Sequence, residues 1–262
     1  MLDEILNLLL RWAHVFAGIL WIGQTWLFLW LDCRFEAATE NPGGRVYLVH
    51  SGGFYVVEKQ RALGALPKTL HWFKWEAALT WLTGMGLLLL VYYRGELLVT
   101  ADASVSSGRA GTLGLGLLPL AWILYDQLFA RAGRAELSAA IAGYLLLAAT
   151  GFGLSQVLSG RAAWMHVGTL LGTLMAANVW MRILPGQRAM LAATAAGRSP
   201  DASLGDRAKQ RSRHNTFMVV PLVLIMLSNH FPTLTYGHQH SAWVLAVVLL
   251  VGGAFATILR RR

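Results

Sequence analysis

Long apolar segments alternate along this chain with short stretches that hold most of its charged residues. Each apolar segment is about 20 residues long, the length of a helix that crosses the hydrocarbon core of a bilayer. We therefore predict an all-α integral membrane protein, a single transmembrane helical domain over residues 1–262 with about seven spans. The predicted spans are Ile5–Leu31, His71–Tyr93, Gly111–Ala130, Ser138–Leu158, Ala162–Leu184, Asn215–Phe231 and Ser241–Leu259.

The composition supports a membrane protein and excludes several other classes. Hydrophobic residues make up 56% of the chain and charged residues only 13%, whereas soluble domains carry about 25% charged residues. The net charge is +9, but no basic stripe is interleaved with aromatic residues as nucleic-acid binding requires. The single cysteine, Cys33, excludes an intramolecular disulfide and a CxxCH site for covalent haem.

The distribution of basic residues predicts the orientation. Lysine and arginine concentrate in the connections 32–70 and 185–214, in the third connection and at the end of the chain, whereas the opposite side has only Arg94, Arg109 and Arg161 in its loops. The positive-inside rule places the N-terminus outside and the C-terminus in the cytoplasm. We expect a multi-pass protein of a bacterial-type inner (plasma) membrane, with 32–70 and 185–214 as long cytoplasmic connections.

The connection 185–214 has a helical pattern with clear stop and start signals. Its first part reads as a short helix that ends at Gly197. Ser199-Pro200-Asp201 then predicts a turn and an N-cap, after which a basic helical stretch leads into the sixth span.

Four histidines lie within or at the edge of the predicted spans, where an ionisable group is expensive and often marks a function. By helical rise, His14, His166 and His230 share the outer half of the bundle, whereas His71 lies at the inner face. Two layers of histidine in a helical bundle suit haem b, one or two per chain, with each iron bound by imidazoles from different helices. The alternative is that these histidines pack between helices and bond to backbone or hydroxyl groups.

Two further features leave their roles open. Glu76 lies in the inner part of the second span, where it relays protons or simply pairs with Lys74 or a basic loop residue. Gly168, Gly172 and Ala176 recur at four-residue spacing, which favours a helix contact over a haem slot.

Several motifs together resemble the membrane domain of the PuuD-type urate oxidases (urate hydroxylases), over nearly the whole chain. They are Arg11-Trp12-Ala13-His14, Gly18 to Gly23, His50 to Lys59, Leu70 to Glu76 with its His-Trp-Phe-Lys-Trp-Glu string, His166 to Thr169, Ala177 to Trp180, Pro185 to Arg188, Ala208 to Asn215 and Leu227 to Pro232 with its Ser-Asn-His-Phe-Pro string. The resemblance implies a membrane oxidase that converts urate towards 5-hydroxyisourate. In that family a C-terminal cytochrome c domain is thought to receive the electrons, but this sequence has no CxxCH. Either the sequence is cut off before such a domain, or a separate cytochrome c or quinone is the acceptor.

The leading hypothesis is a haem b-containing membrane oxidoreductase that acts on urate or a related purine. His14, His166 and His230 are the expected pool of haem-iron ligands, and His71 is an inner ligand or a proton-handling residue. Because urate is anionic near neutral pH, Lys74, Glu76 and the basic stretch Arg211 to Asn215, with His214, are the candidates for substrate contact and catalysis. The rival hypotheses are a proton-coupled purine or anion transporter and a non-catalytic, haem-bearing membrane anchor of a redox complex.

Overall fold

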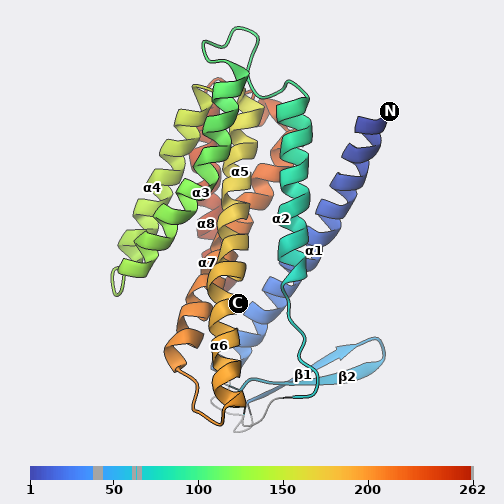
Figure 1. The fold of residues 1–262 in the computed structure, drawn as a ribbon, viewed down its shortest axis with the longest axis vertical. Helices are drawn as coiled ribbons and strands as arrows, with labels where there is room; N and C mark the ends of the chain where they lie inside the picture. Colours follow the sequence, from blue (N-terminus) through green and yellow to red (C-terminus); the bar gives the residue numbers. More distant parts are fainter. Residues whose placement is uncertain (38–43, 61–62, 64–66, 261–262) are drawn as a thin grey trace.

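The structure is a computed structural model that describes residues 1–37, 44–60, 63 and 67–260. The predicted connection 32–70 is therefore described only in part. The described helices form a long bundle (Figure 1). They are α1 (Leu2–Ala37), α2 (Trp75–Leu88) with the π-helical turn η1 (Leu89–Arg94), α3 (Ser107–Arg131), α4 (Glu136–Ser155), α5 (Gly160–Ala177) with the π-helical turn η2 (Asn178–Ile183), α6 (Leu184–Ala195), α7 (Ala202–Leu227), the 3-10 turns η3 (Ser228–His230) and η4 (Pro232–Leu234), and α8 (Ser241–Arg260).

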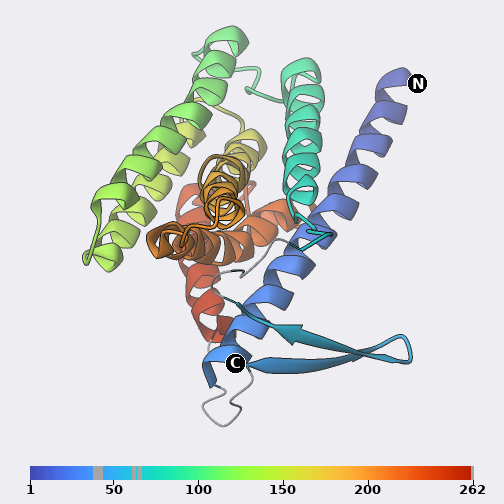
Figure 2. The same ribbon diagram turned by 60° about the horizontal axis from the view of Figure 1, so that its bottom comes forward.

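The helix α5 is the centre of the bundle and runs through η2 into α6 as one continuous rod (Figure 1). Its residues are buried on every side, and Trp164, His166 and Val167 are almost completely inaccessible. A helix that is apolar all round is expected at such a position. The helices α2, α3, α4 and α7 pack directly on α5, whereas α1 lies at the edge of the bundle and packs mainly on α2 (Figure 2).

Six of the described helices are long and apolar enough to cross a membrane, which indicates a multi-pass membrane protein. They correspond to six of the seven predicted spans, with ends that differ by a few residues. The remaining predicted span, Asn215–Phe231, falls in α7, which does not meet the same criterion because its first half carries a run of basic and polar residues. Nevertheless α7 packs between α5 and α8, with buried residues that include Val219 and Ile225.

The helix ends in the connection 185–214 agree with the sequence. The helix α6 ends at Ala195, and Gly197 follows with a φ of +66°, a conformation that glycine adopts without strain. Asp201 is the N-cap of α7, since its Oδ1 accepts a hydrogen bond from the Ser203 backbone N–H at 2.9 Å. The predicted start of the second span at His71 is wrong, because α2 begins at Trp75, after a non-helical approach.

The first connection contains a β-hairpin that stands outside the all-α bundle (Figure 1). Strands β1 (Arg45–His50) and β2 (Gly53–Glu58) are antiparallel and rich in the β-branched and aromatic residues that favour strands. Ser51 and Gly52 both have positive φ, as the two-residue turn of a tight hairpin requires.

The small residues Gly168, Gly172 and Ala176 on α5 were expected to form a helix contact, and this holds for Gly168 but not for Gly172. A Cβ on Gly168 would lie 2.7 Å from the Met226 side chain of α7, so this glycine permits the close approach of the two helices. Gly172 has open space where its side chain would be, so it makes no such contact with the described residues.

Candidate functional site

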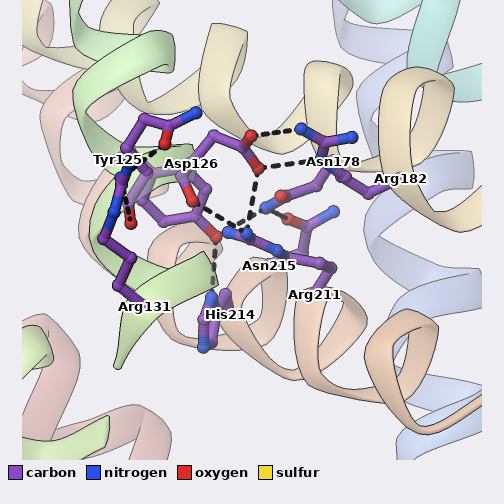
Figure 3. A network of polar contacts seen from close by, with 9 residues as sticks. Tyr125, Asp126, Arg131, Asn178, Arg182, Arg211, His214 and Asn215 are labelled. Carbon is purple, nitrogen blue, oxygen red and sulfur yellow. Dashed lines mark hydrogen bonds and ion pairs between the residues drawn. The ribbon is translucent and has the colours of Figure 1, made fainter. Parts of the chain in front are cut away.

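Both π-helical turns among the described residues carry polar side chains that contact neighbouring helices. The turn η1 supplies Tyr93, and η2 supplies Asn178 and Arg182, which lie four residues apart and both contact α3. Wide turns of this kind inside α-helices are frequent at functional sites. The turn η2 leads to a buried polar network between α3, α5 and α7, shown in Figure 3.

The network is built around the carboxylate of Asp126 on α3, whose side chain is only 5% exposed. Arg182 binds both of its oxygens, with Nε 2.8 Å from Oδ1 and Nη2 on Oδ2. Arg211 of α7 donates from Nη2 to the same Oδ1 at 2.9 Å (Figure 3). A carboxylate at this depth is tolerated only because it is paired and hydrogen-bonded, and the two arginines provide both.

The neighbouring residue, Tyr125, joins this cluster to a histidine. Asn178 donates from Nδ2 to the Tyr125 hydroxyl at 2.9 Å, and that hydroxyl lies 2.7 Å from Nδ1 of His214 (Figure 3). The Arg211 guanidinium covers the Tyr125 ring, 5.0 Å from its centre. Asn215 receives a second hydrogen bond from Asn178 Nδ2 at 2.9 Å and fixes the amide. Tyr125 therefore connects α3, η2 and α7 at a single point.

His214 continues the connection to a carboxylate at the edge of the bundle. Its Nε2 lies 3.2 Å from Oε1 of Glu136, the first residue of α4, which also pairs with Arg213. Because Glu136 accepts, we assign the proton to Nε2, so that Nδ1 accepts from the Tyr125 hydroxyl. Tyr125, His214 and Glu136 thus form a chain of hydrogen bonds from a buried site to a carboxylate that is 34% exposed.

Two buried atoms of the network are unused. Among the described residues, Nη1 of Arg211 and Oδ1 of Asn178 have no hydrogen-bond partner. Such groups are expensive to leave unsatisfied in a low-dielectric interior. The first is a donor and the second an acceptor. The first can donate to a carbonyl, and the second can accept from an N–H.

The charge of this region is complementary to an anion. Arg182 and Arg211 face Asp126, and Arg213 faces Glu136, so three guanidinium groups stand against two carboxylates. With His214 neutral, the region carries one excess positive charge.

Two of the histidines expected to bind haem iron are held in a similar way. Nδ1 of His14 lies 2.9 Å from the Thr80 carbonyl, and Nδ1 of His166 lies 2.7 Å from the Ala162 carbonyl. In each ring a hydrogen bond from Nδ1 to a carbonyl leaves Nε2 unprotonated, which is the form that binds metals. A glycine of the opposite helix faces each ring: a Cβ on Gly84 would lie 2.9 Å from the His14 ring, and one on Gly114 would lie 2.7 Å from His166.

The surroundings of the two rings differ at Nε2. The Tyr93 hydroxyl lies 2.9 Å from Nε2 of His166, whereas no described residue makes a hydrogen bond to Nε2 of His14. His14 therefore has the free, unprotonated nitrogen that a haem iron would need. Ligation by His166 requires that the Tyr93 phenol first turns away.

The remaining expected site residues lie elsewhere. His71 and His230 are exposed, and among the described residues no hydrogen bond or ring contact joins any two of His14, His71, His166 and His230. In the same part of the chain, no group of three or more His, Cys, Asp or Glu side chains is placed to hold a metal ion. The ammonium group of Lys74 faces the rings of Trp72, Trp75 and Trp180.

Glu76 is not paired with Lys74 by any ion pair between described residues, and its Oε2 is buried without a hydrogen-bond partner. Of the expected candidates for substrate contact and catalysis, Arg211, His214 and Asn215 belong to the polar network, whereas Lys74 and Glu76 do not.

Sequence reasoning named the α7 side of the network, in the stretch Arg211 to Asn215, but missed the residues on α3 and η2 although a signal was present. Asp126 lies inside the predicted span Gly111–Ala130 and Arg182 inside Ala162–Leu184. A charged residue inside a membrane span usually marks a functional site, so Asp126 and Arg182 could both have been named as candidates from the sequence. Asn178 lies in the family motif Ala177 to Trp180, which suggested no role for it, and Tyr125 has no comparable signal because tyrosine is common in helix contacts.

The comparison with known families found one match. The model of the family described as urate oxidase N-terminal matches residues 1–260, nearly the whole chain. No curated protein and no solved structure matches the chain. The match agrees with the family resemblance of the motifs, and the chain belongs to the urate oxidase N-terminal family.

Proposed function

We propose that this protein is a membrane oxidoreductase that oxidises urate or a closely related purine, as in the PuuD-type urate oxidases. Membership of the urate oxidase N-terminal family carries the proposal. The buried network of Asp126, Tyr125, Asn178 and Arg211 supports it, because the network offers what a purine anion needs. A seven-span arrangement with the basic connections and the C-terminus in the cytoplasm, in a bacterial-type inner membrane, is part of the same proposal.

The purine binds against the unused atoms of the network. Urate presents ring N–H and C=O groups side by side, so a carbonyl accepts from Arg211 Nη1 and an N–H donates to Asn178 Oδ1. The excess positive charge of the region favours the anionic form. The Tyr125 hydroxyl lies next to both residues, within hydrogen-bond distance of Asn178.

Protons leave along the chain from Tyr125 to Glu136. Oxidation of urate towards 5-hydroxyisourate removes two electrons and two protons from the purine and adds the oxygen of a water molecule. Tyr125 passes a proton to Nδ1 of His214 as Nε2 releases its own proton to Glu136. His214 is thus a relay residue, and Glu136 delivers the proton to the exposed end.

Haem b remains part of the proposal as an electron carrier. His14 is the ligand that fits best, with His166 as a second ligand after movement of Tyr93; the exposed His230 and His71 are weaker candidates. When bound, haem supplies a one-electron acceptor inside the bundle. The final acceptor is a cytochrome c or a quinone.

A direct assay uses the purified protein in lipid nanodiscs with urate and ferricyanide as a water-soluble acceptor. We expect urate loss coupled to ferricyanide reduction. Arg211→Lys keeps the charge but loses the forked guanidinium, so KM should rise about tenfold or more, the effect of one lost hydrogen bond to a charged group. Arg198→Lys is the matched control, because Arg198 is exposed and outside the network.

The rival functions give different results in the same preparation. A proton-coupled purine or anion transporter would accumulate labelled urate in proteoliposomes without reducing ferricyanide. A haem-bearing anchor would show a haem spectrum that urate does not reduce. Either result, with no urate oxidation, would overturn the proposal.

A further inference from the structure

A second group of cations lies where η2 faces the start of α2, apart from the polar network. The ammonium group of Lys74, just before α2, lies 5.9 Å from the ring centre of Trp72. The guanidinium carbon of Arg188, on α6, lies 6.0 Å from the centre of the same ring. Trp180 of η2 completes the group, because Lys74 also lies 5.9 Å from its ring centre. Two positive charges from separate elements therefore gather around one indole.

No described carboxylate compensates these two charges. Neither Lys74 nor Arg188 forms an ion pair or a hydrogen bond with a described residue. The sequence of α6 contains no acidic residue, and Glu76 of α2 makes no ion pair with Lys74. Glu58 of the hairpin is paired with Arg45. Even with Glu76 ionised, the group keeps one excess positive charge. An indole attracts cations without neutralising them, so the group attracts an anion.

Trp72 is also one wall of a small cavity between α6 and the segment that leads into α2. The volume of the cavity is about 330 Å³, within the range of about 300–1,000 Å³ that is usual for small-molecule sites. Gln187 and His71 line it too, and neither side chain has a hydrogen-bond partner among the described residues. The cavity therefore offers a flat indole and unused donors and acceptors to a molecule of modest size.

These features together select a flat anion. A phosphate, free or in a lipid headgroup, would satisfy the two cations but would make no use of the Trp72 wall. A planar heterocycle packs face to face on an indole, as nucleic-acid bases do on aromatic side chains. Its ring N–H and C=O groups can bond to the amide of Gln187. A neutral purine would lack the negative charge that Lys74 and Arg188 call for, whereas urate carries it near neutral pH.

We infer that this cavity is a second binding site for a purine anion, which lies against Trp72 with its charge met by Lys74 and Arg188. It captures the purine from the basic side of the bundle before the purine reaches the buried network. The inference rests on the proposed function for the identity of the purine. The turn η2 borders both sites, since Trp180 lies beside Lys74 while Asn178 belongs to the network.

Binding is tested without turnover by modifying the purified, acceptor-free protein with phenylglyoxal and mapping the modified arginines. Arg188 and Arg198 are both exposed, so Arg198 is an internal control. At saturating concentration, urate should slow modification of Arg188 at least about fivefold by mass action and leave Arg198 unchanged. Neutral hypoxanthine and inorganic phosphate should protect neither.

Trp72→Leu removes the flat wall and should abolish the protection of Arg188 by urate. Trp243→Leu, at an exposed position of α8, should keep it. The proposal is overturned if urate does not protect Arg188 or if protection persists in Trp72→Leu. Protection by phosphate, by hypoxanthine or by nanodiscs of phosphatidylglycerol as strong as that by urate would also overturn it.

Turnover separates this inference from the proposed function. At low ionic strength and saturating ferricyanide, Arg188→Gln should lower kcat/KM for urate about tenfold, because a cation at the entry speeds capture of an anion. Its kcat should stay within about twofold, and salt should lower its kcat/KM less than that of the wild type. Arg198→Gln is the control. Unchanged kcat/KM and salt dependence in Arg188→Gln contradict the capture site. Absence of urate oxidation in the wild type contradicts the proposed function instead, and the protection of Arg188 then decides the site by itself.

Discussion

Nδ1 of His214 lies 2.7 Å from the hydroxyl oxygen of Tyr125, and this contact joins α7 to α3 in the interior of the bundle. The buried ion pair of Asp126 with Arg211 lies on one side of this contact. An apolar groove between α3, α4, α7 and α8 lies on the other side. We propose that the contact is the first step of a proton path that ends at Glu136.

Replacing the relay histidine should slow turnover with little effect on substrate binding. In His214→Gln we expect kcat for urate to fall about 100-fold, the low end of the effect of a positioned acid or base, and KM to stay within about threefold. The dependence of kcat on pH should also flatten, since a group that loses and regains a proton has been removed. His238→Gln, in an exposed loop, is the control. A normal kcat with an unchanged pH profile would exclude His214 from proton transfer.

The buried carboxylate of Asp126 should matter more for stability than an exposed one. Asp126→Asn leaves Arg182 and Arg211 without their counter-charge, and loss of one partner of a buried pair costs about 3–5 kcal/mol. Glu58→Gln removes a partner of exposed Arg45, and this change should lower stability far less because solvent screens the exposed pair. Thermal unfolding of both variants in detergent provides the comparison. Equal midpoints would mean that the buried pairs add nothing to stability.

Gly114 and Gly116 of α3 make a matched pair for the packing around His166. A Cβ on Gly114 would lie 2.7 Å from Nε2 of His166 and 2.8 Å from the Tyr93 hydroxyl, whereas nothing lies within 4 Å of one on Gly116. We expect Gly114→Ala to lower stability by about 1–3 kcal/mol, as overpacking does. Gly116→Ala should be neutral or stabilising because alanine favours a helix. A lower unfolding midpoint for Gly116→Ala than for Gly114→Ala would show that α3 does not pack closely against His166.

Haem content tests the cofactor directly. The pyridine haemochrome of the purified protein should give at least one haem b per chain, with a sharp α-band on reduction. His14→Ala should lose haem because it removes the ligand whose Nδ1 is anchored on the Thr80 carbonyl. His50→Ala, in the exposed hairpin, should keep it. A wild-type protein without haem would remove the cofactor from the account, and unchanged haem in His14→Ala would remove this ligand.

The helices were predictable because each rests on local information. Length and apolarity located six of the spans, and the Gly197 and Asp201 signals located the ends of α6 and α7. The start of α2 was predicted four residues too early, at His71. Trp72 and Phe73 are as apolar as the helix that follows, but they lie before its first residue, Trp75.

The site was less predictable because it depends on how the helices are rotated against one another. Asp126 and Arg182 were visible as charges inside spans, but their pairing needs α3 and η2 to face each other. Nothing in the local sequence marks the π turn that directs Asn178 and Arg182 to α3. His214 was singled out through its basic neighbours and the family resemblance, yet its partner Tyr125 lies 89 residues away along the chain.

The most direct test of the account is the anaerobic reaction of the purified protein with urate and ferricyanide in ¹⁸O-labelled water. The account predicts that urate disappears without dioxygen, that two ferricyanide ions are reduced per urate, and that the product carries one ¹⁸O atom. Urate that stays unchanged with every acceptor tried, in protein shown to be folded, would contradict the claim that this chain is a urate-oxidising enzyme.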